Sequence, residues 1–435
     1  MKTTMKKICT LAAMLLLVLL CSSSVFAAVT PREYGMVRDG SDKYYFIDYK
    51  MLKNQWKVSL GDKYYFGADG KAVKGAVKFG DKYYFFTQEG KLLQTGEVSV
   101  QKVGTDYYCV YGTGRVKTSG WYQLRYYGED GKVLKGIQNV DGKWWAFDEQ
   151  GNRMSSDLTQ IKTFGTDVYC INRSGSVRCS AWYQNHYFGK DGKAYKGPKI
   201  VDGKYWLFGT NGALVRPSAP SIQKYGSQYY GVNTDGTVRT GWYLLNNELY
   251  YGYCKTYGAI FRNKTWLNVT FNSNGTCVKN YTAKAKIEAL KLVEKATNEK
   301  MTREEKLKAC FYYIADQSRF RYWLPYDPKN VGASAWQHMV AYQFLSERKG
   351  TCTGFAVGFA ACADVLGYNS TIVRGRIPGS RDQAADGLTR HTWIKIDGKV
   401  YDPEGMWARF NPTYATNGYP LRHQIVNTYD YRSYY

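Results

Sequence analysis

Two cysteines in the stretch KGTCTGFAVGFAACADVLG, residues 349–367, differ in the chemistry they could perform. Residues 352–366 fit a helix that Gly367 would end, and Cys352 would occupy its first turn, directly after a Gly-Thr step. In a first turn, unpaired backbone N–H groups and the positive end of the helix dipole favour a thiolate and can stabilise an oxyanion. Cys362 instead shares an apolar stripe with Phe355 and Phe359, which is typical of a buried thiol. The sequence therefore predicts a nucleophile at Cys352 and core packing at Cys362.

A nucleophilic cysteine needs a base, and the base needs a group that orients it. The segment RHTWIKIDGKVYDPEG, residues 390–405, fits a β-hairpin with Asp397-Gly398 as a two-residue turn. Counting back from this turn pairs Ile394 with Tyr401 and makes Asp402 the diagonal neighbour of His391. Such neighbours lie roughly 7 Å apart at the backbone, within reach of their side chains. The register therefore predicts an imidazole and a carboxylate that meet on one face of the hairpin.

The same elements resemble a known family. Gly350-x-Cys352 at a helix start, His391-x-Trp393 and Tyr401-Asp402-Pro403 are similar to the motifs of the transglutaminase-like domain of the papain-like cysteine enzymes, over roughly residues 285–410. The resemblance implies an α+β fold in which Cys352 is the nucleophile, His391 the general acid/base and Asp402 the residue that fixes the imidazole tautomer. It also implies attack on an amide of a protein or peptide, a thioester intermediate, and acyl transfer to an amine or hydrolysis by water, with no metal or organic cofactor. Trp323, Trp336 and Gln337 are the candidates for a side-chain donor to the oxyanion.

The flanking residues predict the elements that would hold this site. Residues 283–296 are helical in composition, and Thr302-x-x-Glu305 forms a capping box before a second apolar helical pattern that includes Cys310. AWQHMVAYQFLSER, residues 335–348, is a third helix candidate, and residues 370–376 form a strand candidate. The polar segment 377–389 is expected to border the substrate cleft. His338 and His423 have no comparable partners and are expected to be bystanders.

The middle of the chain is built from short repeated units. Units such as GDKYYFGADGKAVKG combine an aromatic strand, a glycine-containing turn and a short second strand, which is the pattern of a β-hairpin. Longer related units begin at Gly104, Gly165 and Gly226, 61 residues apart. A fixed period of this kind indicates stacked units that bury their faces against their neighbours. We therefore expect an all-β hairpin-repeat solenoid over residues 41–279, with the 61-residue period in 97–279.

These repeats resemble the cell-wall-binding repeats of Gram-positive surface proteins, of the choline-binding and glucan-binding type. In that family, aromatic side chains of successive hairpins form shallow cages, because aromatic faces attract quaternary ammonium groups and stack on sugar rings. The Gly-Trp step of the pattern occurs only at Trp121 and Trp242, which argues against complete choline cages. Packing within the array is the alternative role for these aromatics. The candidate ligand-binding residues are Trp121, Trp144, Trp145, Trp182, Trp206, Trp242 and Trp266.

The cysteines give no metal motif and one possible bridge. The chain has ten cysteines and four histidines but no Cys-x-x-Cys or His-Glu-x-x-His, so a zinc site is not expected. If Ser174-Gly175 is a hairpin turn, Cys170 lies directly opposite Cys179, where a disulfide could form. The preceding repeat has Cys109 and Thr118 in these places, so the fold does not require the bridge.

The N-terminus and the charge predict an exported protein. Residues 1–27 have a lysine-containing start, an apolar run and a small-residue cleavage site, and we expect them to be a signal peptide. A lipid-modified Cys21 is the alternative, although Leu20 stands where a small residue would be expected. No later segment resembles a transmembrane helix. The net charge of +24 suits acidic surface polymers or anionic membranes, with general solubility as the alternative, and nucleic acid is not an expected partner. The expected partner of the repeats is a cell-wall polysaccharide or a teichoic-acid-like polymer.

These observations predict a multidomain protein that is secreted and associated with the cell wall. A short segment (28–40) and the repeats (41–279) precede a transglutaminase-like catalytic domain (280–435). The expected activity is that of a cysteine protease, amidase or acyltransferase acting through a Cys-His-Asp triad. The alternatives are a non-catalytic surface adhesion protein with the same fold, and an amidase that acts on cell-wall peptide cross-links.

Overall fold

The computed structural model describes residues 29–324 and 334–433. The expected signal peptide at 1–27 and the alternative at Cys21 therefore lie outside the described residues. None of the helices in the described part of the chain has both the length and the apolar character needed to cross a membrane. Contacts divide the described residues into two compact units: one ends at residue 180 and also includes residues 190–193, and the other consists of residues 181–189 and the described residues from 194 onward.

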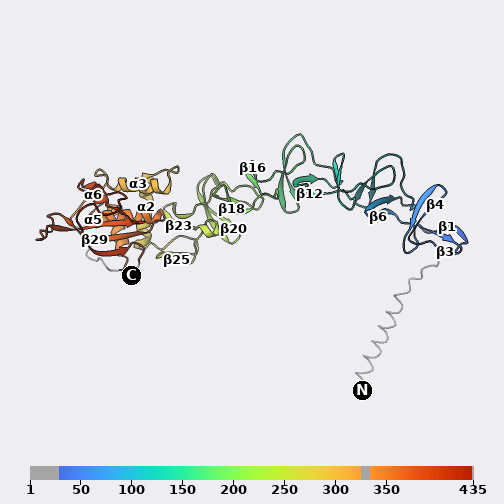
Figure 1. Cartoon of the computed structure of the whole chain (residues 1–435). Helices are drawn as coiled ribbons and strands as arrows, with labels where there is room; N and C mark the ends of the chain where they lie inside the picture. Colours follow the sequence, from blue (N-terminus) through green and yellow to red (C-terminus); the bar gives the residue numbers. More distant parts are fainter. Residues whose placement is uncertain (1–28, 325–333, 434–435) are drawn as a thin grey trace, which may run out of the picture. The chain divides into compact units, whose positions relative to one another are not determined.

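The first unit consists of antiparallel hairpins, as the aromatic repeats predict (Figure 1). Strand β4 turns into β5 through Leu60 and Gly61, which both have positive φ angles of 52° and 81°, and this is the backbone that a tight hairpin turn requires. The second strands β5 and β7 end in the buried aromatics Phe66 and Phe86, and Phe66 packs in a small core with Tyr45 and Leu52. The strands are β1 (Tyr34–Asp39), β2 (Asp42–Ile47), β3 (Lys50–Met51), β4 (Gln55–Ser59), β5 (Asp62–Phe66), β6 (Gly75–Phe79), β7 (Lys82–Phe86), β8 (Ser99–Val103), β9 (Asp106–Val110), β10 (Gly120–Tyr122), β11 (Arg125–Tyr127), β12 (Gly136–Val140), β13 (Lys143–Phe147), β14 (Gln160–Phe164) and β15 (Asp167–Ile171).

The predicted pairing of Cys170 with Cys179 is wrong. After β15 the chain turns through Asn172 to Ser176, and Ile171 pairs with Val177. This register is one residue away from the one that a Ser174-Gly175 turn would give. The two cysteines are therefore not directly opposite each other, and both thiols are free.

The second unit begins with further hairpins that end in a larger sheet. Strands β20 to β24 form a five-stranded sheet in the order β20-β21-β24-β23-β22, and β25 pairs with β26. The elements are β16 (Ala181–Tyr183), β17 (His186–Phe188), β18 (Gly197–Val201), β19 (Lys204–Phe208), β20 (Ser221–Tyr225), β21 (Gln228–Val232), β22 (Gly241–Leu245), β23 (Glu248–Tyr253), a short helix η1 (Cys254–Thr256), β24 (Ala259–Ile260), β25 (Lys264–Trp266) and β26 (Val269–Phe271).

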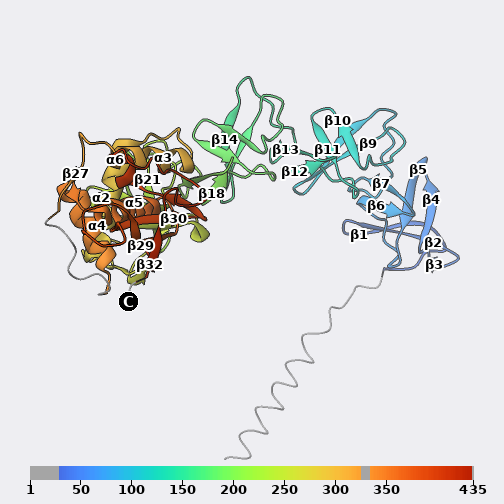
Figure 2. The same ribbon diagram turned by 60° about the vertical axis from the view of Figure 1, so that its left-hand side comes forward.

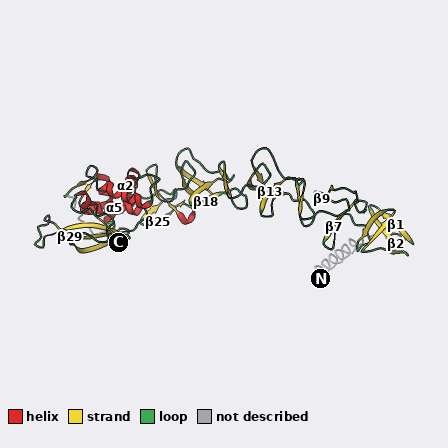
Figure 3. Ribbon diagram, turned by 45° about the horizontal axis from the view of Figure 1, so that its top comes forward, coloured by secondary structure: helices red, strands yellow, loops and turns green. Residues whose placement is uncertain are grey.

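The α-helices of the described residues lie in the C-terminal part of the second unit, beside a four-stranded sheet in the order β31-β30-β29-β32 (Figures 2 and 3). Thr302 and Glu305 form the predicted capping box of α3. The elements are α2 (Tyr281–Ala296), α3 (Arg303–Ile314), β27 (Arg321–Tyr322), α4 (Trp336–Glu347), β28 (Lys349–Gly350), α5 (Cys352–Val365), β29 (Ser370–Pro378), β30 (Leu388–Ile396), β31 (Lys399–Tyr401), α6 (Pro403–Trp407) and β32 (Gln424–Asp430). The chain therefore combines mostly β-hairpin repeats with a helical C-terminal domain, which is the predicted fold class.

Helix α5 is the centre of this domain and is buried on all sides. Gly354 and Gly358 face Phe344 of α4 so closely that an added Cβ would lie 2.8 and 2.5 Å from the phenylalanine ring. The absence of side chains at these two positions lets α4 pack directly against α5. The other side of α5 packs on β30 and β29. The N-terminus of α5, and with it Cys352, is therefore fixed between the helices and the sheet.

Candidate functional site

Cys352 is the first residue of α5, as the sequence predicts. The preceding Lys349–Gly350 strand pairs in parallel with Arg321–Tyr322, so Tyr322 lies next to the start of this helix. The N–H groups of a first helical turn have no partner within the helix. Cys352 is 6% exposed, which shields its thiol from bulk water while leaving it at the wall of a cavity.

His391 and Asp402 come from the hairpin β30–β31 and the residue that follows it. The observed pairs Ile396–Lys399, Lys395–Val400 and Ile394–Tyr401 confirm the register expected from the Asp397-Gly398 turn. His391 Nε2 lies 2.8 Å from Asp402 Oδ2, and the two residues are 4% and 0% exposed. The hairpin therefore brings together an imidazole and a carboxylate that the sequence separates by ten residues.

Further hydrogen bonds fix the carboxylate of Asp402. Its Oδ2 also accepts a hydrogen bond from the Tyr419 hydroxyl at 2.6 Å, and its Oδ1 accepts one from the backbone N–H of Gly405 at 2.9 Å, at the start of α6. Burial raises the pKa of Tyr419, and the neighbouring Asp402 raises it further, so this hydroxyl stays protonated and donates. Tyr419 lies in a loop 17 residues after Asp402, and no sequence pattern singled it out.

The thiol and the imidazole change each other's proton affinity. Burial alone would raise the pKa of Cys352, but its hydrogen bond to His391 and the charge of that ring outweigh burial, and the pKa is lowered. Burial would likewise lower the pKa of His391, but the charge and hydrogen bond of Asp402, together with the thiol, raise it well above its ordinary value. Because Nε2 is engaged by Asp402, Nδ1 is the ring atom left to face the sulfur. The arrangement favours a thiolate–imidazolium pair.

Glu404 is a second buried carboxyl at this site. Its Oε2 lies 3.6 Å from His391 Nδ1. Burial raises the pKa of Glu404 to about 7, and the positive charge of His391 opposes this rise. The sequence reading missed Glu404, although its place directly after Asp402-Pro403 is a signal that could have identified it.

The ligand atoms of His391, Asp402 and Glu404 lie within 4.8 Å of one another, a spacing that could hold a metal ion. The oxygens of Asp402 already accept hydrogen bonds from the imidazole, a hydroxyl and a backbone amide. We therefore assign this group a hydrogen-bonding role.

A cavity of about 490 Å³ lies beside the thiol. Cys352, His391 and Tyr322 line it, as do Arg381 and Asp382 of the polar segment that was expected to border the cleft. The three residues considered as oxyanion donors do not line it. Trp336 is buried against Tyr429, Gln337 donates to the backbone of Tyr431, and Trp323 is 48% exposed.

The tryptophans of the repeats lie in clusters with other aromatic side chains. Trp121 and Trp145 lie 5.3 Å apart between ring centroids, and Trp182 and Trp206 lie 5.2 Å apart in the same edge-to-face arrangement. Trp144 packs against the core around Tyr169, and Trp242 and Trp266 belong to a core that includes Phe271. The guanidinium of Arg153 lies over both Trp121 and Trp145, at 5.8 and 5.3 Å, where an external cation would bind. The pair Trp182 and Trp206 is therefore the better candidate for a ligand site.

His338 is not at the site. It is buried in α4, where its ring contacts Tyr431, and burial lowers its pKa to about 3. His423 is exposed and lies edge-on to Trp393.

Known proteins and protein families each match only a part of this chain. Residues 290–412 match the family model of the transglutaminase-like superfamily. Glucosyltransferase-S of Streptococcus mutans is 26% identical over 190 residues, which are 41% of this chain and 12% of that protein. Glucosyltransferase-I of Streptococcus downei is 26% identical over 238 residues, which are 51% of this chain and 14% of that protein. The matched part is therefore a small fraction of these relatives.

Among solved structures, choline binding protein F from Streptococcus pneumoniae is 23% identical, with a TM-score of 0.30, and the match covers 57% of this chain and 99% of that one. CbpJ from Streptococcus pneumoniae is 20% identical, with a TM-score of 0.29, and the match covers 56% of this chain and all of that one. Residues 290–412 thus carry a transglutaminase-like domain, and about half of the chain is similar in sequence to a small part of the glucosyltransferases.

Proposed function

We propose that this chain, which carries a transglutaminase-like domain after repeats of the choline-binding type, is an exported cysteine enzyme that acts on amides of proteins or peptides at the cell wall. One observation carries the proposal: Cys352, His391 and Asp402 are buried together, and the pKa values of the thiol and the imidazole are shifted toward each other. A shift in this direction is what nucleophilic catalysis by a cysteine requires.

In the proposed reaction, the Cys352 thiolate attacks the amide carbonyl carbon, an S–C bond forms, and the carbonyl electrons move to the oxygen. The Nδ1–H of His391 donates its proton to the amide nitrogen as the C–N bond breaks, which releases the amine and leaves a thioester. Water or a second amine then attacks the thioester and gives a proton to His391, and the C–S bond breaks to restore the thiolate. Asp402 holds the ring in the tautomer that both steps need.

The oxyanion formed in each step needs hydrogen-bond donors. The backbone N–H groups of the first turn of α5 are positioned for this role. We assign a second donor to the Tyr322 hydroxyl, which lines the cavity and accepts a hydrogen bond from Arg381 at 2.8 Å. Because that oxygen accepts from the guanidinium, its own proton is available for the substrate.

The direct test is incubation of the protein with a glutamine-containing peptide and a labelled amine, followed by mass spectrometry. Amine incorporation, deamidation and backbone cleavage give three different mass changes, so the experiment distinguishes acyl transfer from the two kinds of hydrolysis. We expect Cys352→Ala and His391→Ala to reduce the rate by about 10³-fold or more. Glu299→Gln, at an exposed residue of the same domain, should leave the rate unchanged.

The protonation state of the thiol gives an independent test. We expect a neutral alkylating reagent to modify Cys352 rapidly at pH values well below the ordinary thiol pKa, because the pKa of Cys352 is lowered by His391. In His391→Ala the hydrogen bond and the charge of the imidazole are lost, while burial still raises the pKa of Cys352, so the reactive form should appear at a higher pH than in the wild type. Identical pH profiles for the two proteins would refute the ion pair and leave a non-catalytic adhesion protein.

We further propose that the repeats hold the enzyme at the wall through the aromatic pair Trp182 and Trp206 together with the basic charge of the chain. Aromatic faces bind sugar rings and quaternary ammonium groups, and positive charge attracts acidic polymers. Sedimentation with isolated cell walls, in the presence of choline, glucan or increasing salt, would show which contribution dominates. Cys352→Ala should sediment like the wild type, because anchoring does not use the thiol.

A further inference from the structure

The cavity beside Cys352 carries an excess of positive charge. Its described lining includes three arginines, Arg374, Arg381 and Arg390, and one aspartate, Asp382. The thiolate and the imidazolium, which also line it, neutralise each other. The charge of the cavity is therefore set by how the arginines are paired.

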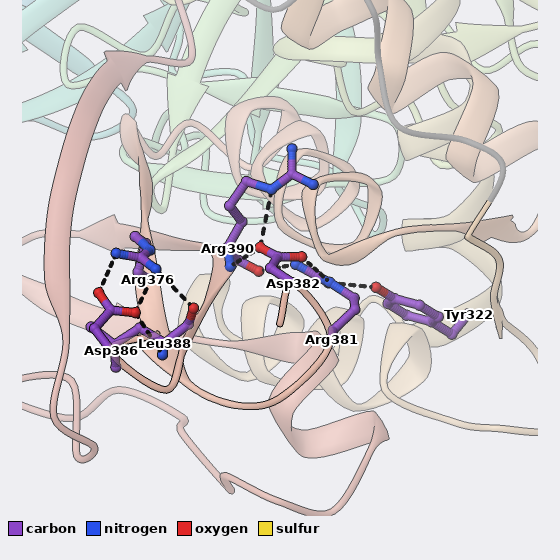
Figure 4. A network of polar contacts seen from close by, with 7 residues as sticks. All are labelled: Tyr322, Arg376, Arg381, Asp382, Asp386, Leu388 and Arg390. Atoms are coloured by element: carbon purple, nitrogen blue, oxygen red, sulfur yellow. Dashed lines mark hydrogen bonds and ion pairs between the residues drawn. The ribbon is translucent and has the colours of Figure 1, made fainter. Parts of the chain in front are cut away.

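Asp382 is shared by two of these arginines (Figure 4). One of its oxygens accepts from Arg381 Nε at 3.1 Å, and the other accepts from the backbone N–H and Nε of Arg390 at 2.7 and 3.1 Å. Arg381 also donates to the Tyr322 hydroxyl and to the backbone carbonyl of Arg390. These bonds fix the polar segment as one wall of the cavity.

Arg374 is different, because its guanidinium has no hydrogen bond or ion pair with any residue that the structure describes. It is half-buried in β29, paired with Thr392 of β30 on one side and with Asn427 of β32 on the other, and all three residues line the cavity. Thr392 is hydrogen-bonded to Thr353, the residue after Cys352, at 3.0 Å. Arg374 therefore belongs to the same wall as the nucleophile, and none of the described residues compensates its charge.

We propose that Arg374 binds a carboxylate of the acyl donor, so that the enzyme selects peptides with a free carboxylate next to the amide that reacts. This inference rests on the function proposed above and adds the class of substrate to it. A half-buried guanidinium has lost part of its hydration, and a carboxylate can replace it with two parallel charge-assisted hydrogen bonds. A phosphate has similar chemistry, but a carboxylate fits a peptide substrate, which carries such groups within one or two residues of its amides.

The first experiment measures binding of an anion without requiring turnover. Iodoacetate and iodoacetamide alkylate the same thiolate, with loss of iodide, and differ in that only iodoacetate carries a carboxylate. We expect the ratio of the iodoacetate rate to the iodoacetamide rate at Cys352 in the full-length protein to fall about tenfold in Arg374→Gln. Arg374→Lys should recover part of the ratio. Lys395→Gln removes the same charge from β30 outside the cavity lining and should leave the ratio unchanged.

The second experiment compares two peptides that differ only in a free or an amidated carboxylate beside the reacting amide. Wild type should prefer the free carboxylate by about tenfold in kcat/KM, and Arg374→Gln should lose this preference while its rate on the amidated peptide is retained. A phosphorylated peptide serves as a third arm, and its preference over the free carboxylate would overturn the carboxylate assignment.

The outcomes separate the two proposals. If Cys352 is not alkylated faster than the other thiols by either reagent, the proposed enzymatic function fails. If Cys352 reacts rapidly but the ratio is the same in wild type, Arg374→Gln and Lys395→Gln, the function stands and the anion site is refuted. An unchanged iodoacetamide rate in Arg374→Gln shows that the variant is folded, so a change in the ratio reports on charge.

Discussion

A buried thiol ordinarily keeps its proton, because a thiolate in an apolar environment is poorly solvated. The structure shows both kinds of thiol on one helix. The hydrogen bond that the Cys362 thiol donates to Cys310, together with burial, raises the pKa of Cys362 well above its ordinary value, whereas the imidazole of His391 lowers that of Cys352. The difference between the two cysteines comes from their neighbours, since both side chains are buried. Helix α5 positions the Cys352 thiol, and His391 of the hairpin β30–β31 stabilises its thiolate form.

At the residue scale, the raised pKa of Glu404 predicts how the stability of the protein depends on pH. The pKa of its carboxyl is raised from 4.5 to about 7 in the folded protein, so between these values the folded state holds a proton that the unfolded state has lost. The contribution of this proton to stability is fully present below pH 4.5 and is lost as the pH rises through 7. Replacing Glu404 by Gln removes the dependence. Urea unfolding at pH 5 and pH 8 should therefore show a loss of stability that is about 2 to 3 kcal/mol larger in wild type than in Glu404→Gln.

Glu299→Gln is the matched control, because Glu299 is exposed. This variant should lose as much stability between pH 5 and pH 8 as the wild type. If the wild type and Glu404→Gln lose the same stability between pH 5 and pH 8, this result would contradict the assignment of a protonated Glu404 in the folded state.

At the scale of elements, the sequence predicted those parts of the site that depend on local periodicity. The two-residue turn at Asp397-Gly398 fixes the pairing of β30 with β31, and this is why the contact between His391 and Asp402 could be counted from the sequence. The start of α5 was readable from Gly350-Thr351 and its end from Gly367, which has a φ of 88°.

The sequence could not predict contacts that depend on tertiary packing. Tyr419 reaches Asp402 from a loop, and Tyr322 reaches the cavity through a two-residue parallel strand, and neither has a periodic pattern. The predicted pairing of Cys170 with Cys179 failed for a different reason. The turn after Ile171 contains one residue fewer than expected, and a shift of one residue is enough to separate two cross-strand positions.

The sheet that carries His391 makes a second prediction. Gly375 pairs with His391 across β29 and β30, and a Cβ at Gly375 would lie 2.5 Å from the Trp393 ring and close to the backbone carbonyl of Gln424. Gly375→Ala should therefore displace Trp393, on which the His391 ring stacks, and lower stability by about 1 to 3 kcal/mol. We also expect the alkylation rate of Cys352 at neutral pH to fall. Gly418→Ala is the control, because nothing lies within 4 Å of the added carbon.

At the scale of the whole second unit, the last repeats and the first helix share one core. Trp242 of β22 and Phe271 of β26 pack with Ala283 and Ile287 of α2. The buried Lys286 of α2 lies over the ring of Trp242, with its Nζ 4.4 Å from the ring centroid. Lys286 also forms a buried ion pair with Asp364 of α5. A continuous set of contacts therefore runs from the repeats to the helix that begins with Cys352.

This shared core predicts that the catalytic part is not independent of the repeats that precede it. The expected domain boundary at residue 280 would cut the core, because it removes Trp242 and Phe271 and exposes the apolar face of α2. A fragment of residues 181–435 should retain the melting temperature of this unit in the full chain, whereas a fragment of residues 280–435 should melt at a lower temperature or aggregate. In the full chain, Trp242→Ala should reduce the stability of this unit by about 3 to 5 kcal/mol, as expected for a large-to-small change in a core. Trp323→Ala is the control, since that side chain is 48% exposed and should have a small effect. Equal melting temperatures for the two fragments would show that the boundary at 280 is a true one and that the packing of Trp242 on α2 contributes little.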